Sequence, residues 1–183
     1  MELKERVIKV LDLLEEHYGP TKCYLTHENA WQLLIATILS AQCTDERVNM
    51  VTKELFKKYT SVKDFAEADQ AELEQDIRST GFFRNKAANI IGCCQMLLSE
   101  YGGEVPSDID KLIKLPGVGR KTANLVVGDI YGKPAVVADT HFIRLCNRLG
   151  FVSTENPEAV EREMRKLLPP WWYLSGIFGS KSA

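Results

Sequence analysis

The chain has 183 residues, of which 45% are hydrophobic and 26% are charged, as in an average soluble globular protein. This length allows one domain or two small ones with a sizeable core, and no apolar run approaches the roughly 18 residues that span a bilayer. The charged start, Met1 to Glu5, differs from a secretory signal peptide. Because the net charge is −2, binding to a nucleic acid would require a local basic patch.

The spacing of the apolar residues has a helical period along nearly the whole chain. An apolar stripe from Leu3 to Leu14 marks the first helix, and Thr44-Asp45 is a typical start of a later one. Only residues 135–138 resemble an extended segment. Further helices are expected over residues 31–39, 45–56, 70–79, 84–101, 108–114, 120–131, 140–149 and 157–168. The sequence therefore predicts an all-α fold made of many short helices.

Five cysteines stand at positions 23, 43, 93, 94 and 146. Their number is odd, and their spacing matches neither a disulfide framework nor a set of paired zinc ligands. Reduced thiols are the simplest interpretation, because disulfides are rare in reducing compartments. The cysteines thus indicate a cytoplasmic protein.

The sharpest motif is Leu-Pro-Gly-Val-Gly-Arg-Lys-Thr-Ala at residues 115–123, which joins two predicted helices. Gly117 and Gly119 allow the dihedral angles of a tight turn and the close approach of a ligand to the backbone. The helix that follows would present free amides and the positive end of its dipole, which suits a phosphate group. A purely structural turn between two helices is the alternative, and the spacing alone leaves both interpretations open.

Two ionisable residues near this turn are candidates for chemistry. Lys121 lies in the first turn of the second helix, where the dipole favours a neutral amine that can form a Schiff base. Asp139 precedes the helix expected from Thr140, where the dipole favours a charged carboxylate that could stabilise a cation or accept a proton. A phosphate-contacting lysine and an ordinary helix cap are the alternatives. Local spacing does not show whether the two side chains meet.

Several stretches occur in the order found in the endonuclease III family of DNA repair glycosylases, within the helix-hairpin-helix superfamily, and the chain resembles this family. The resemblance covers roughly residues 1–168 and its motifs are highly specific. The matching stretches are residues 39–45 (Leu-Ser-Ala-Gln-Cys-Thr-Asp), 81–91, 103–106 (Gly-Glu-Val-Pro), 115–124, and 137–141 together with Arg144, Asn147 and Arg148.

The resemblance implies a bifunctional enzyme. Such enzymes flip a damaged pyrimidine out of the duplex, cut its glycosidic bond and nick the strand by β-elimination. Lys121 matches the nucleophile that attacks the sugar C1′ and holds the Schiff base, and Asp139 matches the carboxylate that assists this step.

The resemblance also implies DNA contacts. Gln42 matches the residue that fills the space left by the flipped base, and Phe82 falls at an apolar wedge beside the orphaned partner base. His141 follows the carboxylate as in the family. Core packing of Phe82 or Phe83 and a structural role for His141 are the alternatives. The hairpin residues expected to contact DNA are Gly117, Val118, Gly119, Arg120 and Thr122.

Two further observations favour the lyase-competent branch of the superfamily. The helix around residues 31–41 lacks the catalytic glutamate of the adenine-removing relatives, while Lys121 is present. Cations near the motifs could contact phosphates in a salt-dependent way, although for each cation taken singly an ordinary surface charge is the favoured interpretation. These cations are Arg84, Lys86, Arg120, Lys121, Arg144 and Arg148.

The sequence departs from the family after its two adjacent prolines. Most members carry four cysteines spaced C-x6-C-x2-C-x5-C that hold a [4Fe-4S] cluster, and none of the four is present here. We therefore expect no metal and no cofactor of the cluster type, while the resemblance leaves open a monovalent cation held by backbone carbonyls of the hairpin. Residues 171–183 resemble nothing in the family, which indicates either a truncated or frame-altered member or a lineage without the cluster.

The resemblance implies an all-α fold of two lobes with the DNA cleft between them. Residues 22–131 would form one lobe, with the helix-hairpin-helix motif at about 108–131, and residues 1–21 with 132–183 the other. Lys121 and Asp139 would face each other across the cleft. The expected enzyme is a cytoplasmic, nucleoid-associated monomer that acts on double-stranded DNA with a damaged, oxidised pyrimidine or an abasic site. A DNA-binding helix-hairpin-helix module without catalysis is the alternative.

Overall fold

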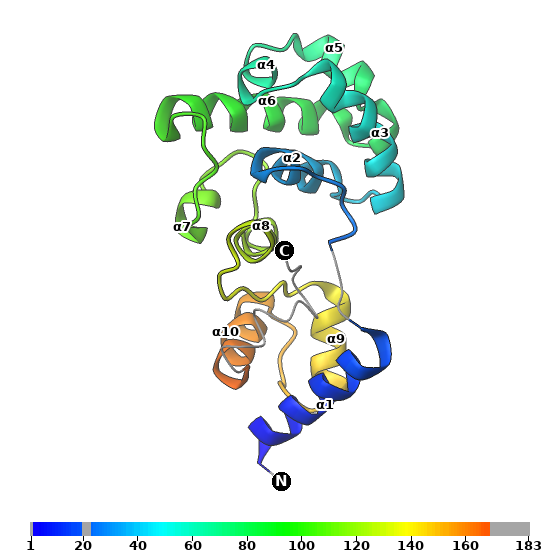
Figure 1. The fold of residues 1–183 in the computed structure, drawn as a ribbon, viewed down its shortest axis with the longest axis vertical. Helices are drawn as coiled ribbons and strands as arrows, with labels where there is room; N and C mark the ends of the chain where they lie inside the picture. Colours follow the sequence, from blue (N-terminus) through cyan, green and yellow to red (C-terminus); the bar gives the residue numbers. More distant parts are fainter. Residues whose placement is uncertain (1, 20–22, 169–183) are drawn as a thin grey trace. The chain divides into compact units, whose positions relative to one another are not determined.

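The computed structural model describes residues 2–19 and 23–168, and every regular element in these two ranges is a helix (Figure 1). The predicted all-α class is therefore confirmed. Within the same ranges, none of the helices combines the length and apolarity that crossing a bilayer requires. The elements are α1 (Leu3–Tyr18), α2 (Ala30–Leu39), α3 (Asp45–Lys58), α4 (Val62–Ala66), α5 (Gln70–Asp76), the 3-10 helix η1 (Arg78–Thr80), α6 (Phe83–Tyr101), α7 (Ile109–Leu112), α8 (Arg120–Tyr131), α9 (Thr140–Arg148) and α10 (Pro157–Leu167).

Polar side chains fix where several helices begin, because they accept hydrogen bonds from first-turn amides that have no partner inside the helix. The Thr44 hydroxyl accepts from the Arg47 amide at 3.3 Å, so the predicted start of α3 is confirmed. Asn29 caps α2 and Asn156 caps α10 in the same way. These caps fix the residue at which each of the three helices begins.

Three short segments differ from the prediction. The helix expected over residues 70–79 is interrupted, since α5 ends at Asp76 and η1 continues in the tighter 3-10 form. The helix expected over 108–114 is the four-residue α7, and α4 was not predicted because five residues show no clear period.

The chain divides into two compact units, one of residues 24–126 and one of residues 1–23 with 127–183. The division falls inside α8, between Val126 and Val127, whereas the sequence places it after residue 131. Lys121 thus belongs to the first unit and Asp139 to the second.

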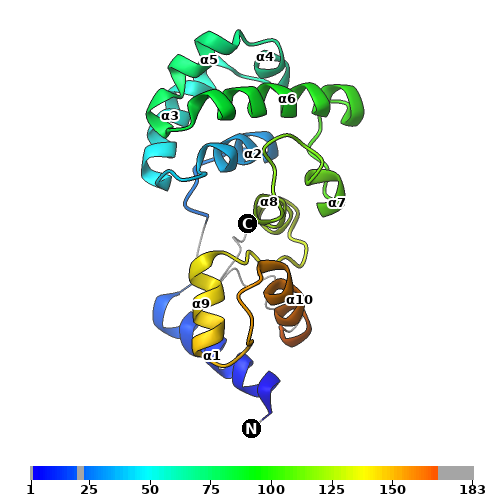
Figure 2. The same cartoon turned by 180° about the vertical axis from the view of Figure 1, so that it is seen from behind.

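In the unit of residues 24–126, α6 packs against α4 and α5 on one side and against α2 on the other; Figure 2 shows this arrangement from behind. The large side chains Leu33, Phe65, Leu73 and Ile90 are fully buried in this unit. Burial of such residues is the main stabilising contribution to a helical core. The long helix α6 is therefore the central element of this unit, against which α2, α4 and α5 pack.

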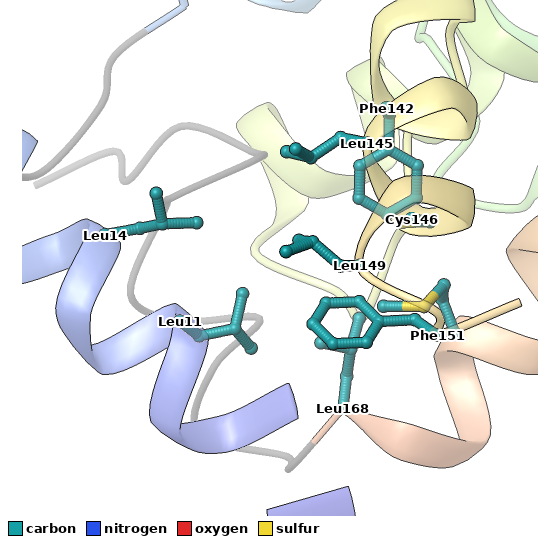
Figure 3. Close-up of a pocket in the computed structure, with 9 residues that line it drawn as sticks. Leu11, Leu14, Phe142, Leu145, Cys146, Leu149, Phe151 and Leu168 are labelled. Atoms are coloured by element: carbon teal, nitrogen blue, oxygen red, sulfur yellow. The ribbon is translucent and has the colours of Figure 1, made fainter. Parts of the chain in front are cut away.

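The other unit has an apolar core formed by α1, α9 and α10. Val7 and Leu11 of the predicted stripe are buried there, while Leu3 is 40% exposed, so the stripe is only partly covered. Figure 3 shows a pocket in this unit into which Leu11 and Leu14 of α1 point. Its lining is apolar apart from the Cys146 thiol, and burial raises the pKa of that thiol to about 12, which disfavours the nucleophilic thiolate. The predictions about residues 169–183 lie outside the described residues.

Candidate active site

The Gly-x-Gly motif forms the turn between α7 and α8. Gly117 has a φ of 75°, in the left-handed region that favours glycine. The turn packs closely on α6, since a Cβ atom on Gly92 would lie 3.3 Å from Cγ of Pro116. Val118 is buried, and its amide donates to the carbonyl of Leu115 at 3.1 Å. Neither the side chain nor the amide of Val118 is therefore open to a ligand, which restricts the predicted contact of Val118 to its carbonyl.

The start of α8 presents the predicted nucleophile to solvent. Gly119, Arg120 and Lys121 are exposed, and Thr122 is half-buried. The helix begins at Arg120, and the Ala123 amide donates to the Gly119 carbonyl at 2.9 Å. The amides before Ala123 therefore belong to the first turn, where a helix attracts anions. Lys121 is thus accessible to a ligand bound at this end of α8.

Asp139 is the N-cap of α9, so the alternative of a helix cap applies to it. Its Oδ1 accepts a hydrogen bond from the Phe142 amide at 2.8 Å. This bond uses one of the two carboxylate oxygens, so capping and a second role are compatible. His141 follows in the first turn of α9 with its side chain exposed. That Asp139 faces Lys121 stays a prediction from the family resemblance.

Gln42 and Phe82, the two residues expected to enter the duplex, share an uncommon backbone conformation. Their φ angles are 52° and 48°, and among the described residues they are the only non-glycine residues with positive φ. Such conformations cost energy and persist only where the surroundings hold them. Both side chains are exposed, and Phe82 reaches 63%.

The aromatic pair at the start of α6 is divided between two environments. Phe83 is half-buried, and the guanidinium groups of Arg78 and Arg84 lie 5.9 and 5.7 Å from its ring centroid. Core packing therefore applies in part to Phe83 and not to Phe82. An exposed aromatic ring on a constrained turn has the form expected of a wedge.

Lys86 was expected among the cations near DNA, and this expectation is wrong. Its side chain is buried in α6, and the ammonium Nζ donates to the carbonyls of Leu39 and Thr80. Burial lowers the pKa of Lys86 below its usual range. The helical period could have revealed this position, because Lys86 lies on the same face of α6 as Ile90, Cys93 and Leu97, which are all buried. Arg84, Arg144 and Arg148 are exposed.

Three of the five cysteines are poor ligands for the [4Fe-4S] cluster of the family. Cys93 and Cys94 are adjacent within α6, and both are buried, as is Cys146 in α9. Burial raises the pKa of Cys93 and of Cys146 to about 12, and it raises that of Cys94 still further. Cluster ligands are thiolates, whereas these sites favour the neutral thiol.

Comparison with known proteins identifies the family. Residues 35–170 match the HhH-GPD superfamily of base excision DNA repair proteins. The endonuclease III of Synechocystis sp. is 48% identical over 171 residues, which are 92% of this chain and 78% of that protein.

Solved structures agree with the sequence match. A non-covalent endonuclease III–DNA complex is 47% identical with a TM-score of 0.90, and the match covers 96% of this chain and 83% of that one. A trapped endonuclease III–DNA covalent intermediate has the same identity and TM-score, with 96% and 84% covered. The predicted helix-hairpin-helix glycosylase fold is thus confirmed, and the chain belongs to the endonuclease III family, within the HhH-GPD superfamily of base excision DNA repair proteins.

Proposed function

We propose that the protein is a DNA glycosylase that removes oxidised pyrimidines from double-stranded DNA and nicks the resulting abasic site as an AP lyase. The observation that carries this proposal is the exposed Lys121 at the start of α8, directly after the Gly-x-Gly turn. The covalent DNA intermediate of a protein 47% identical to this chain supports a covalent mechanism. No cofactor is required, and the enzyme acts as a cytoplasmic, nucleoid-associated monomer.

Lys121 performs the covalent step. Its neutral amine attacks C1′, the bond between C1′ and the base nitrogen breaks, and the base leaves with the electron pair and takes up a proton. As the C1′–O4′ bond breaks, the ring oxygen takes up a proton and the sugar opens to the iminium, while the amine loses a proton. Asp139 stabilises the positive charge that develops at C1′ and accepts this proton, as the resemblance implies.

The lyase step follows from the same intermediate. The iminium acidifies the C2′ proton, and its removal expels the 3′ phosphate by β-elimination, which breaks the strand. Hydrolysis of the imine then releases Lys121. An enzyme of this kind requires no further nucleophile, so a single lysine substitution abolishes covalent capture.

The turn and the two constrained residues hold the DNA. The amides from Gly119 to Thr122 bind a backbone phosphate at the start of α8, with Arg120 adding charge. Gln42 fills the space of the extruded nucleotide, and Phe82 packs beside the orphaned base. His141 adds a contact beside Asp139. Taking the target base out of the stack gives Lys121 access to C1′.

Borohydride trapping tests the proposal. The purified protein is incubated with sodium borohydride and a duplex that contains one abasic site, and in parallel with a duplex that contains thymine glycol. A covalent adduct with both is expected. Lys121→Ala should give none, whereas Lys114→Ala, a change at another exposed lysine, should leave it intact. An adduct that survives in Lys121→Ala would refute the assignment. Binding without any adduct would instead indicate a DNA-binding module without catalysis.

A further inference from the structure

A buried lysine links the two segments that carry Gln42 and Phe82. The side chain of Lys86 is 4% exposed, and its Nζ donates to the Leu39 carbonyl at 2.8 Å and to the Thr80 carbonyl at 2.7 Å. Both bonds are short and charge-assisted, which places them among the stronger hydrogen bonds in proteins. They join points that are 47 and 6 residues away from Lys86 in the chain.

The two acceptors lie where helices end. Leu39 is the last residue of α2, and Thr80 is the last residue of η1. Carbonyls in the last turn of a helix lack a partner within it and carry its negative dipole end, so an ammonium group is a suitable partner. Thr80 is itself held, because it is buried and its hydroxyl donates to the Ile77 carbonyl at 2.8 Å.

Each acceptor is followed at once by a turn with a left-handed residue. Gln42 comes three residues after Leu39, and Phe82 comes two residues after Thr80. These are the two described non-glycine residues with positive φ. Their conformations depend on the anchoring of the chain just before them. One nitrogen atom therefore fixes the starting points of both turns relative to each other.

We infer that Lys86 is a positioning residue for DNA insertion, which holds the Gln42 and Phe82 turns at the spacing that opens a duplex. The inference rests on the proposed function in assigning Gln42 and Phe82 to the DNA. Lys86 itself contacts no nucleotide, since it is buried. Insertion of both side chains into one base-pair step requires a fixed separation of the turns, and a rigid link costs less at the moment of binding than ordering two independent loops.

The chemistry of the residue fits this task. An ammonium group offers three N–H donors from one atom, so it can serve two carbonyls at once. A methionine of similar length would fill the space and leave both carbonyls without this donor. Lys86→Met therefore removes the two hydrogen bonds while it keeps the side-chain packing of α6, where Ile90 lies on the same face as Lys86.

Fluorescence of 2-aminopurine tests the inference. The probe stands opposite a tetrahydrofuran abasic analogue in a duplex, and its emission rises when it loses stacking. All measurements use saturating protein, so that affinity does not enter, and a temperature at which circular dichroism shows each variant folded. We expect the wild type to raise the emission, and Lys86→Met to lose most of the rise while still binding. The matched control Leu97→Ala, a buried change in the same helix, should keep it.

A double-mutant comparison separates positioning from general stability. In the Gln42→Ala/Phe82→Ala background, Lys86→Met should cause no further loss of the signal, because its effect runs through those two residues. If Lys86→Met does not fold, Lys86→Gln serves instead, since it keeps an N–H donor but cannot reach both carbonyls with one charged group. A full rise in the Lys86 variant, an equal loss in Leu97→Ala, or no rise in the wild-type complex would overturn the inference. The abasic analogue has no reactive C1′, so the assay is independent of whether Lys121 forms an adduct.

Discussion

The side chain of Asn89 occupies the space beside Gly117 that any larger residue would need. A Cβ atom added to Gly117 would lie 2.8 Å from Cβ of Asn89 and 3.1 Å from its amide carbon and nitrogen. Asn89 projects from the middle of α6, which the other helices of its unit hold in place. Because Gly117 has no side chain, the turn can pack directly against Asn89 of α6. This contact fixes the position of the turn, and therefore of the start of α8, relative to α6.

Gly117→Ala should distort this turn. Alanine with a φ of 75° and a contact of 2.8 Å is strained twice, so we expect a loss of about 2 kcal/mol or more in the free energy of unfolding. Gly119→Ala is the control, because nothing lies within 4 Å of the added atom, and its cost should not exceed about 1 kcal/mol. Urea unfolding measures both, and equal losses would contradict the role of Asn89.

Phe82→Ala should separate stability from DNA opening. The Phe82 ring is 63% exposed, so its removal should change the free energy of unfolding by no more than about 0.5 kcal/mol. Its loss should nevertheless weaken extrusion of the damaged base, seen as slower single-turnover base release from a duplex. Phe83→Ala should show the reverse order, with the larger effect on thermal unfolding. An unchanged release rate in Phe82→Ala would remove the wedge assignment.

Asp139 serves as a helix cap, and two substitutions distinguish this from a part in catalysis. Asparagine caps as well as aspartate, so Asp139→Asn should keep the stability, whereas Asp139→Ala should lose about 1 kcal/mol. Both should slow base release by about 10²–10⁴-fold, because both remove the negative charge. Melting temperatures and single-turnover rates provide the comparison. If Asp139→Asn retains wild-type activity, the residue is a cap alone.

Stability should fall in alkaline solution because of the buried thiols. Burial raises the pKa of Cys93 from 9.0 to about 12, so between these values the unfolded chain loses a proton that the folded chain retains. Ionisation therefore favours unfolding, and one such thiol reduces stability by up to about 1.4 kcal/mol per pH unit. Urea unfolding near pH 8 and near pH 10 should show a larger decrease for the wild type than for Cys93→Ala. If the two decreases were equal, ionisation of Cys93 on unfolding would not contribute to the loss of stability.

Much of the fold could be predicted from the apolar period, and its failures have local causes. The long helix α6 was expected within one residue of its start, because a sustained stripe and a following Gly-Gly pair define it. The segment Val62–Ala66 is too short to reveal a period, although its N-cap Ser61 accepts a hydrogen bond from Asp64. Its helix is stabilised by tertiary packing of Phe65 against α6 rather than by its own sequence.

In the candidate site too, residues placed by local sequence could be predicted, whereas those placed by tertiary contacts could not. A motif places Lys121 and Asp139 at helix starts without any knowledge of the fold, since glycine and the dipole act locally. Which ring of the Phe82-Phe83 pair faces solvent depends on the left-handed turn, which sequence spacing does not reveal. Lys86 was misplaced because lysine is almost always exposed, and only the carbonyls of two distant helix ends make its burial favourable.

The burial of the cysteines affects how readily oxidants can modify the protein. Peroxides attack thiolates, and the raised pKa values of Cys93 and Cys146 keep both as thiols at neutral pH. Their burial also denies access to the reagent. Both thiols are therefore expected to react slowly with peroxides, and the packing around Cys93 in α6 and Cys146 in α9 should survive exposure to them.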